Sequence, residues 1–180
     1  MDERAEGIVA FWQEAGPKRW YVKDEGFDRE ISERFGSLVE DAAAGKLESW
    51  REAAQSALAL LILLDQFPRN IYRGTPQAFA SDSYASKVAD AAIANGFNKQ
   101  VEGALSQFFY MPFMHAEDLA LQERCIALCE AAGHTNNVGY AKDHADIIRR
   151  FGRFPHRNEV LGRTSTPEEI AFLKGGGFAG

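Results

Sequence analysis

The sequence lacks the features that identify a membrane protein or one of the familiar nucleotide-binding and hydrolytic enzymes. Its longest uninterrupted apolar run covers residues 57–64, whereas a membrane-spanning helix needs about 20 apolar residues. It contains no glycine-rich phosphate loop, no nucleophile elbow and no paired-histidine zinc motif. We therefore expect no membrane association, and the sequence identifies neither a cofactor nor a known reaction.

Basic residues and cysteines are also few. Lys and Arg number 20 against 26 Asp and Glu, a net charge of −6 at pH 7, which argues against a nucleic-acid-binding surface. Cys125 and Cys129 share one helix face without matching a structural zinc spacing, so we expect them to be small buried side chains. The charged residues 1–4 precede no apolar stretch, so we expect no signal peptide and predict a cytoplasmic protein.

No stretch of four to eight residues alternates between apolar and polar in the way a half-buried strand does. Helix starts and stops, by contrast, recur along the chain. One is the helix predicted over 82–95, which Gly96 closes, and another is the proline and capping-box start at 166–169. The prediction is an all-α protein: a single compact helical domain over 1–174, followed by a flexible glycine-rich tail over 175–180.

The segment 49–66 is predicted to be the central helix. Ser49 followed three residues later by Glu52 is typical of a capping box. The apolar run that follows leaves no polar face, so the helix should be buried on all sides. Pro68 lacks an amide donor and disfavours helical geometry at the residue before it, so we expect the helix to stop near Gln66.

Asp65 is then placed in the last turn of that helix, where the helix dipole disfavours a carboxylate by about 0.3–1 kcal/mol. Burial next to the apolar run removes hydration as well, so the carboxylate needs a cation. Arg69 is the nearest candidate. Two interpretations stay open: an internal ion pair that fixes the helix end, or a site of which Asp65, Arg69 and Asn70 form one wall.

A second polar segment resembles the first. Residues 66–70 and 153–158 both follow an apolar helix and both place Arg-Asn just after an aromatic-proline pair. The segment 149–163 holds five arginines against one acid, Glu159. These arginines either pair with acidic helices elsewhere in the chain or bind a carboxylate or phosphate, which the arginine fork suits.

The histidines and one further acid add candidates. His115 and Glu117 lie at a predicted helix start, where they either complement the helix end or act as acid–base groups or metal ligands. His144 falls on the apolar face of its helix, as a satisfied core residue or as a functional group. A metal site would need Asp65 to join these three residues in space, and we predict none.

Three phrases, 64–70, 108–118 and 149–158 with 161–163, resemble the bacterial domain of unknown function 924 family. The resemblance covers nearly the whole chain. It implies an all-helical fold similar to tetratricopeptide-repeat proteins, with antiparallel helix pairs around the buried helix 49–66. The family has no settled activity, so the resemblance carries no catalytic residue over to this chain. The sequence itself shows no legible 34-residue repeat.

Two functions are compatible with these observations. The first is a site for a small anionic molecule, in which the segments 66–70 and 153–158 meet in space and face His115. Its candidate catalytic residues are His115 and Asp65. Its candidate ligand-binding residues are Arg69, Asn70, Glu117, His144, Arg153, His156, Arg157 and Asn158. The alternative is a helical scaffold that binds a peptide or partner protein, with the polar cluster purely structural.

Overall fold

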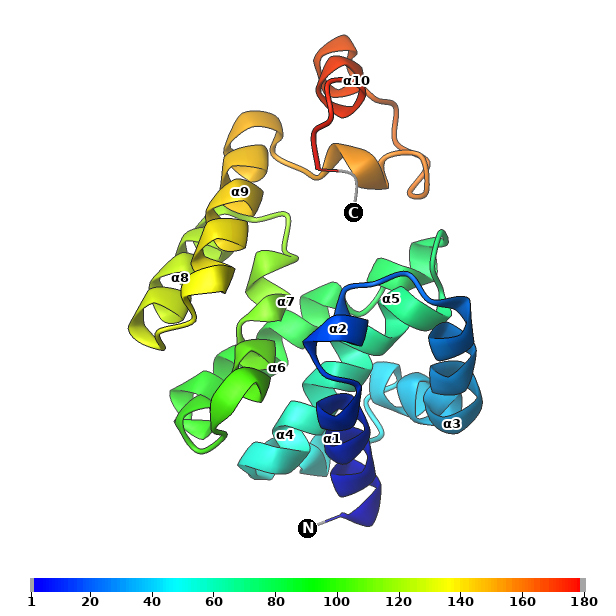
Figure 1. Ribbon diagram of the computed structural model, residues 1–180, viewed down its shortest axis with the longest axis vertical. Coiled ribbons are helices and arrows are strands. Elements are labelled where there is room, and N and C mark those ends of the chain that lie inside the picture. The colour runs from blue at the N-terminus through cyan, green and yellow to red at the C-terminus, as the bar shows by residue number, and fades with distance from the viewer. Residues whose placement is uncertain (1, 179–180) are drawn as a thin grey trace. The chain divides into compact units, whose positions relative to one another are not determined.

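The structure is a computed structural model that describes residues 2–178 (Figure 1). All of the regular secondary structure in this range is helical, which confirms the predicted all-α class. None of the helices in residues 2–178 combines the length and apolar character needed to cross a membrane. The contacts group the chain into two compact units, Met1–Arg73 with Gln77–Pro112 and Gly74–Pro76 with Phe113–Gly180. We call these the N-terminal and C-terminal units and describe each by itself. The single domain over 1–174 stays a prediction.

The N-terminal unit is built from short helices around a buried centre. Its α-helices are α1 (Glu3–Ala15), α2 (Pro17–Trp20), α3 (Glu25–Ala43), α4 (Ala54–Leu61), α5 (Phe67–Ile71) and α6 (Asp82–Ala94). Its other helical elements are η1 (Glu48–Glu52), the π-helical turn η2 (Ile62–Gln66), η4 (Phe97–Lys99) and η5 (Gly103–Phe109). Two short helices, η3 (Pro76–Phe79) and α7 (Met111–Met114), hold residues of both units.

The apolar run 57–64 lies at the centre of this unit, as predicted, with each of its side chains at most 1% exposed. Helix α4 packs against α1 and α6, while α3 packs against α5. Aromatic rings fill the space between these helices. The ring centroid of Trp12 lies 5.5 Å from that of Phe67, 5.7 Å from that of Phe108 and 6.0 Å from that of Phe27. Pairs at such distances add about 0.5–1.5 kcal/mol beyond the burial of their surface.

The predicted limits of the central helix are wrong at both ends. Residues 48–52 form the 3-10 helix η1 rather than a capped start, and Ala53 is extended, so α4 begins at Ala54. At the other end the chain continues through Pro68 into α5. The π-helical turn η2 explains this continuation. The amide of Phe67 donates to the carbonyl of Ile62, five residues back, and Pro68 lies in the first turn of α5, where a missing amide is tolerated.

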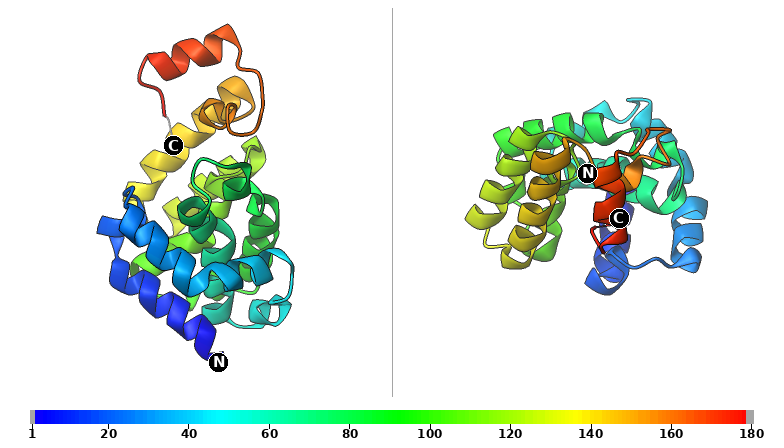
Figure 2. Two further views of the ribbon diagram at one scale, coloured as in Figure 1. Left: turned by 90° about the vertical axis from the view of Figure 1, so that its right-hand side faces the viewer. Right: turned by 90° about the horizontal axis from the view of Figure 1, so that it is seen from above.

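The C-terminal unit contains α8 (Leu119–Ala131), α9 (Thr135–Phe151), η6 (Pro155–Arg157) and α10 (Pro167–Lys174). Helices α8 and α9 lie side by side as an antiparallel pair (Figure 2). The turn between them uses Gly133, whose φ of 73° suits glycine. One antiparallel pair does not make a repeat, so the likeness to tetratricopeptide-repeat proteins stays a prediction.

Side chains of this unit form a core of their own. Ile147, Ile148 and Phe154 are buried together, and both cysteines of α8 are buried with their sulfur atoms 4.0 Å apart. Helix α10 starts with the predicted capping box, in which Thr166 and Glu169 each accept a hydrogen bond from the other's backbone. The core and the cap together fix the segment 149–169, which carries the candidates Arg153, His156, Arg157 and Asn158.

Candidate functional site

The π-helical turn η2 carries Asp65 at its buried side. The carboxylate is 1% exposed. Its Oδ2 accepts a hydrogen bond of 2.6 Å from the side-chain amide of Gln66, and its Oδ1 lies 3.3 Å from Nη1 of Arg69. Arg69 reaches back from α5 because the π turn keeps the two residues on one side of a continuous helix. Such turns often occur at functional sites, which is one reason to keep Asp65 as a candidate.

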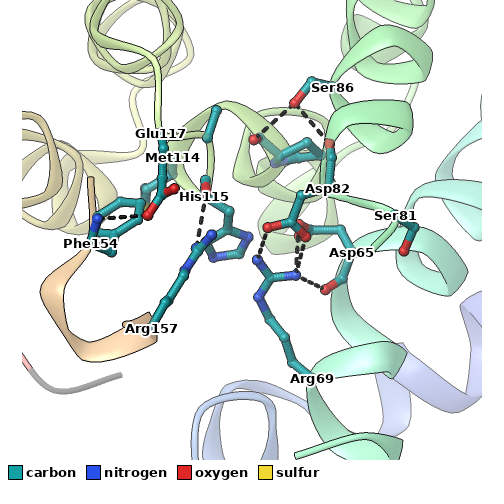
Figure 3. A network of polar contacts seen from close by, with 12 residues as sticks. Asp65, Arg69, Ser81, Asp82, Ser86, Met114, His115, Glu117, Phe154 and Arg157 are labelled. Atoms are coloured by element: carbon teal, nitrogen blue, oxygen red, sulfur yellow. Dashed lines mark hydrogen bonds and ion pairs between the residues drawn. The ribbon is translucent and has the colours of Figure 1, made fainter. Parts of the chain in front are cut away.

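Arg69 lies between two carboxylates. Its Nη1 donates to the backbone oxygen of Asp65 at 2.6 Å, and its two Nη atoms each lie 2.9 Å from an oxygen of Asp82 on α6 (Figure 3). Burial by itself would lower the pKa of Arg69, but the charges of Asp65 and Asp82 outweigh it and raise the pKa. This geometry is the internal ion pair that the structural interpretation expects, with Asp82 as a partner the sequence did not indicate. A ligand-binding role for Arg69 stays a prediction.

Asn70 belongs to a separate network in the N-terminal unit. Its amide donates to Oδ1 of Asp28 on α3 at 2.8 Å. Arg73 donates to both oxygens of the same carboxylate, from Nε at 2.9 Å and from Nη2 at 3.0 Å. The bidentate pair and the amide together tie the end of α5 to α3, so the contacts shown by Asn70 are structural.

In the C-terminal unit the arginines of 149–163 largely meet acids. The ion pairs join Arg149 with Asp146 and Glu123, Arg150 with Glu168, Arg153 with Glu169, and Arg163 with Glu117. The pairs differ in burial, since Glu169 is 2% exposed while Glu168 is 65% exposed at its side chain. Exposed pairs contribute little to stability, whereas loss of one partner of a buried pair is costly. Arg153 and Glu169 are therefore the pair that matters most for the fold.

Glu117 binds the chain at both ends of the 154–163 segment, at Phe154 and at Arg163. Its carboxylate accepts a hydrogen bond from the backbone amide of Phe154 at 2.7 Å (Figure 3). It also accepts two hydrogen bonds from Arg163, at 2.6 and 2.9 Å. Partial burial raises the pKa of Glu117, but the hydrogen bonds from Arg163 and Phe154 outweigh it, so the net pKa lies below its ordinary value. Glu117 is thus a charged anchor at neutral pH.

Asn158 completes this framework. It is 1% exposed and donates to Ser165 at 3.0 Å and to Glu169 at 3.1 Å, while its oxygen accepts from Nε of Arg163 at 2.9 Å. The arginine-rich segment is therefore fixed by a buried, well-satisfied network, which gives rigid support to the side chains beside it.

Those neighbouring side chains form a group that we call the Phe154 cluster, whose members are His115, His144, Phe154, His156, Arg157 and Phe178. The Phe154 ring lies 5.6 Å from both the His144 and the His156 ring. Phe178 contacts the same two histidines, at 4.6 and 5.1 Å.

Arg157 joins the Phe154 cluster through its guanidinium, which lies 4.6 Å over the Phe154 ring and donates to the backbone oxygen of His115 at 3.0 Å (Figure 3). It is only 6% exposed. Stacking on an aromatic ring is a setting that suits guanidinium more than ammonium. One buried arginine and the imidazoles of His144 and His156 therefore converge on one aromatic ring, and the backbone of His115 lies beside the arginine.

His144 is held in a defined protonation state. Its Nδ1 lies 2.7 Å from the backbone oxygen of Tyr140, and a carbonyl can only accept, so Nδ1 carries the hydrogen. Burial, then the positive charges of His115 and Arg157, lower the pKa of His144 to about 4. The imidazole is neutral at pH 7, and its Nε2 is left as a hydrogen-bond or proton acceptor.

The structure thus distributes the candidate residues between the units. Asp65, Arg69 and Asn70 lie in the N-terminal unit, and the remaining candidates lie in the C-terminal unit. The meeting of the two aromatic-proline segments stays a prediction. Among residues 2–178, no group of three or more His, Cys, Asp or Glu side chains is arranged to hold a metal ion.

Sequence reasoning missed the acids that answer the arginines and also Phe178. Asp82 is only the first residue of the helix predicted over 82–95, and Glu169 only a member of the predicted capping box, so neither signal links them to an arginine. Phe178 follows three glycines, and the tail gave no sign that it folds back. Residues 179–180 of the predicted flexible tail lie outside the described residues.

Fold and site together define an all-helical protein whose polar candidates are fixed by buried ion-pair networks. A family model described as a bacterial protein of unknown function (DUF924) matches residues 8–177, so the chain belongs to this family, as the resemblance indicated. A solved structure of a protein of unknown function from Agrobacterium tumefaciens is 46% identical, with a TM-score of 0.92 over 96% of this chain and 98% of that one. No curated protein matches the chain.

Proposed function

We propose that the C-terminal unit binds a small anion, a carboxylate or a phosphate, at the Phe154 cluster. The observation that carries this proposal is the convergence of Arg157 with His144 and His156 around the Phe154 ring, beside the backbone of His115. Arginine is the side chain best suited to planar recognition of carboxylate and phosphate. Histidine adds protonatable donors close to physiological pH.

Two acids bound to the arginine-rich segment favour an anion site rather than a cation site. Glu117 is paired with Arg163 and Glu169 with Arg153, so the negative charge of both carboxylates is largely offset locally. Arg157 adds a permanent positive charge, and His115 and His156 add more when protonated. An entering anion would therefore meet a positive local potential.

Anion binding at this place should be coupled to proton uptake. An anion beside Arg157 would reduce the positive field that lowers the pKa of His144, and would add a negative charge that favours imidazolium. The Nε2 atom of His144, which is the acceptor of the neutral imidazole, is the atom that would take up the proton. His115 keeps the proposed role of proton donor or acceptor at the same anion.

The proposal is tested with inorganic phosphate and acetate, each against sodium chloride at matched ionic strength. We expect the melting temperature of the wild-type protein to rise saturably with one of the two anions, because a ligand that binds only the folded state stabilises it. Arg157→Gln should lose this response. Arg149→Gln is the matched control, since Arg149 is half-exposed and lies outside the cluster.

Because Arg157 is buried, its replacement could unfold the unit, so His156→Asn provides a second variant at a half-buried position. Circular dichroism checks that both variants keep the helical fold. Equal anion responses in wild type, Arg157→Gln and His156→Asn would refute the proposal, as would the absence of any response in the wild type.

A further inference from the structure

We infer that the N-terminal unit carries a separate binding site for a small organic ammonium ion, in a pocket bounded by Trp20 and Glu102. The pocket lies between α1, α2, α4 and the start of η5 and has a volume of about 310 Å³. This volume is at the lower end of the range for small-molecule sites, about 300–1,000 Å³. The site rests on different residues from the proposed anion site, and neither depends on the other.

The floor of the pocket is apolar and aromatic. Val9, Trp20, Val101 and Leu105 line it and are buried. The indole nitrogen of Trp20 already donates to the backbone oxygen of Trp12 at 2.7 Å. The Trp20 ring is 7% exposed and packs against Trp12 and Phe108, at 6.0 and 4.9 Å between ring centroids, so it presents only a small apolar surface to the pocket.

The rim of the pocket is polar and negatively charged. Glu102 is exposed there, and the amides of Gln13 and Gln55 stand beside the same opening. The described lining residues include no Lys or Arg. The segments 1–73 and 77–112 together contain 17 Asp and Glu against 12 Lys and Arg, so the wider field of this unit also favours a cation.

The shape of the rim leaves room for a ligand body. Gly103 has a φ of 70°, and a Cβ built on it would meet no heavy atom within 4 Å. The next residue, Ala104, is exposed and also lines the pocket. A butyl chain could thus rest on Val101 and Leu105 while its ammonium group lies beside the carboxylate of Glu102 at the rim. The structure assigns the pocket to an alkylammonium of about this length.

The test uses n-butylammonium, with n-butanol and butyrate as neutral and anionic probes of the same length. Tryptophan side-chain N–H resonances report binding, because Trp20 lines the pocket while Trp50, whose indole donates to Asp2, does not. We expect butylammonium to shift the Trp20 resonance saturably and to leave that of Trp50 in place. Butanol should bind more weakly, and butyrate should not bind.

Two variants and a control decide the assignment. Glu102→Gln keeps the shape but removes the charge, and should weaken butylammonium binding by about three- to fivefold, as expected for an exposed ion pair. Ala104→Leu should fill the opening and abolish binding. Glu40→Gln, an exposed acid on α3, should change nothing. Binding of butanol as tight as that of butylammonium, an unchanged affinity in Glu102→Gln, or no saturable shift at Trp20 would overturn the inference.

Discussion

At the scale of single residues, His144 links the stability of the C-terminal unit to pH. Burial and the positive charges of His115 and Arg157 hold its pKa at about 4, below the ordinary value near 6.5. On acidification the unfolded chain takes up this proton first. The contribution of neutral His144 is therefore complete above about pH 6.5 and is lost as the pH falls from there toward 4, by about 3 kcal/mol in total.

The measurement is urea unfolding of wild type and His144→Gln at several pH values between 7 and 4. We expect the wild type to lose more stability than the variant over this range, because glutamine takes up no proton. Parallel curves for the two proteins would show that His144 does not titrate as its burial and neighbours require.

Glu169 also has a marked pKa shift, and its contribution to stability, like that of His144, is lost at low pH. The hydrogen bond from Arg153 comes first among the causes that lower its pKa to about 2. Because the folded value lies below the ordinary one, its contribution is present above about pH 4.5 and is lost as the pH falls toward 2. Arg153→Ala should raise the pKa of Glu169 and weaken α10, whose capping box uses the same carboxylate.

Carboxyl-carbon NMR of Glu169 in wild type and Arg153→Ala measures this shift directly. Arg150→Ala is the matched control, since Arg150 binds the neighbouring Glu168 at the surface. An unchanged titration of Glu169 in Arg153→Ala would contradict the assigned ion pair.

At the scale of elements, helix α4 should be the most sensitive part of the N-terminal unit. Leu61, the last residue of α4, is 1% exposed, so Leu61→Ala leaves a cavity that costs about 2–5 kcal/mol. For a chain of this size each kcal/mol lowers the melting temperature by about 2–4 °C. Thermal unfolding by circular dichroism measures the change. Val22→Ala, at a side chain 55% exposed, should change stability by less than about 0.5 kcal/mol, and an equal loss in both variants would place Leu61 outside the core.

The elements also show what local sequence signals can and cannot predict. The helix 82–95 and the capping box at 166–169 were predicted correctly, because glycine closure and reciprocal capping are settled within a few residues. The stop at Pro68 was predicted wrongly for a physical reason. The expectation that proline ends a helix assumes that each amide donates to the carbonyl four residues back. In the π turn at 62–66 the amide of Phe67 donates instead to the carbonyl five residues back.

The candidate site could be predicted only in part, for a related reason. Composition singled out the arginines of 149–163, but their partners lie far along the chain. Glu117 is 46 residues from Arg163, and Glu169 is 16 residues from Arg153. Such ion pairs form only when helices pack together, and no periodic pattern in the sequence predicts them. The contacts of His144 with Phe154 and Phe178 also join residues that are distant in the sequence, and no local pattern predicts them.

At the scale of the whole molecule, charge and residue type are unevenly distributed along the chain. All four histidines lie in the segment 113–180, together with nine acids and eight basic residues, while the remaining chain has an excess of five acids. All three tryptophans lie in the remaining chain. This division matches the proposed sites, an anion site beside histidines in one unit and an ammonium site beside a tryptophan in the other.

The same distribution allows the predicted single domain to be tested. Domain boundaries usually fall in exposed linkers, but here the boundary between Pro112 and Phe113 falls inside α7, and Gly74–Pro76 groups with the C-terminal unit. We therefore expect the two units to unfold together. Tryptophan fluorescence reports the N-terminal unit and histidine proton NMR the C-terminal unit, so the two urea transitions should coincide, as two-state unfolding requires. If the histidine signals unfold at a lower urea concentration than the tryptophans, the chain contains two domains, since a shared cooperative core would not permit one unit to melt alone.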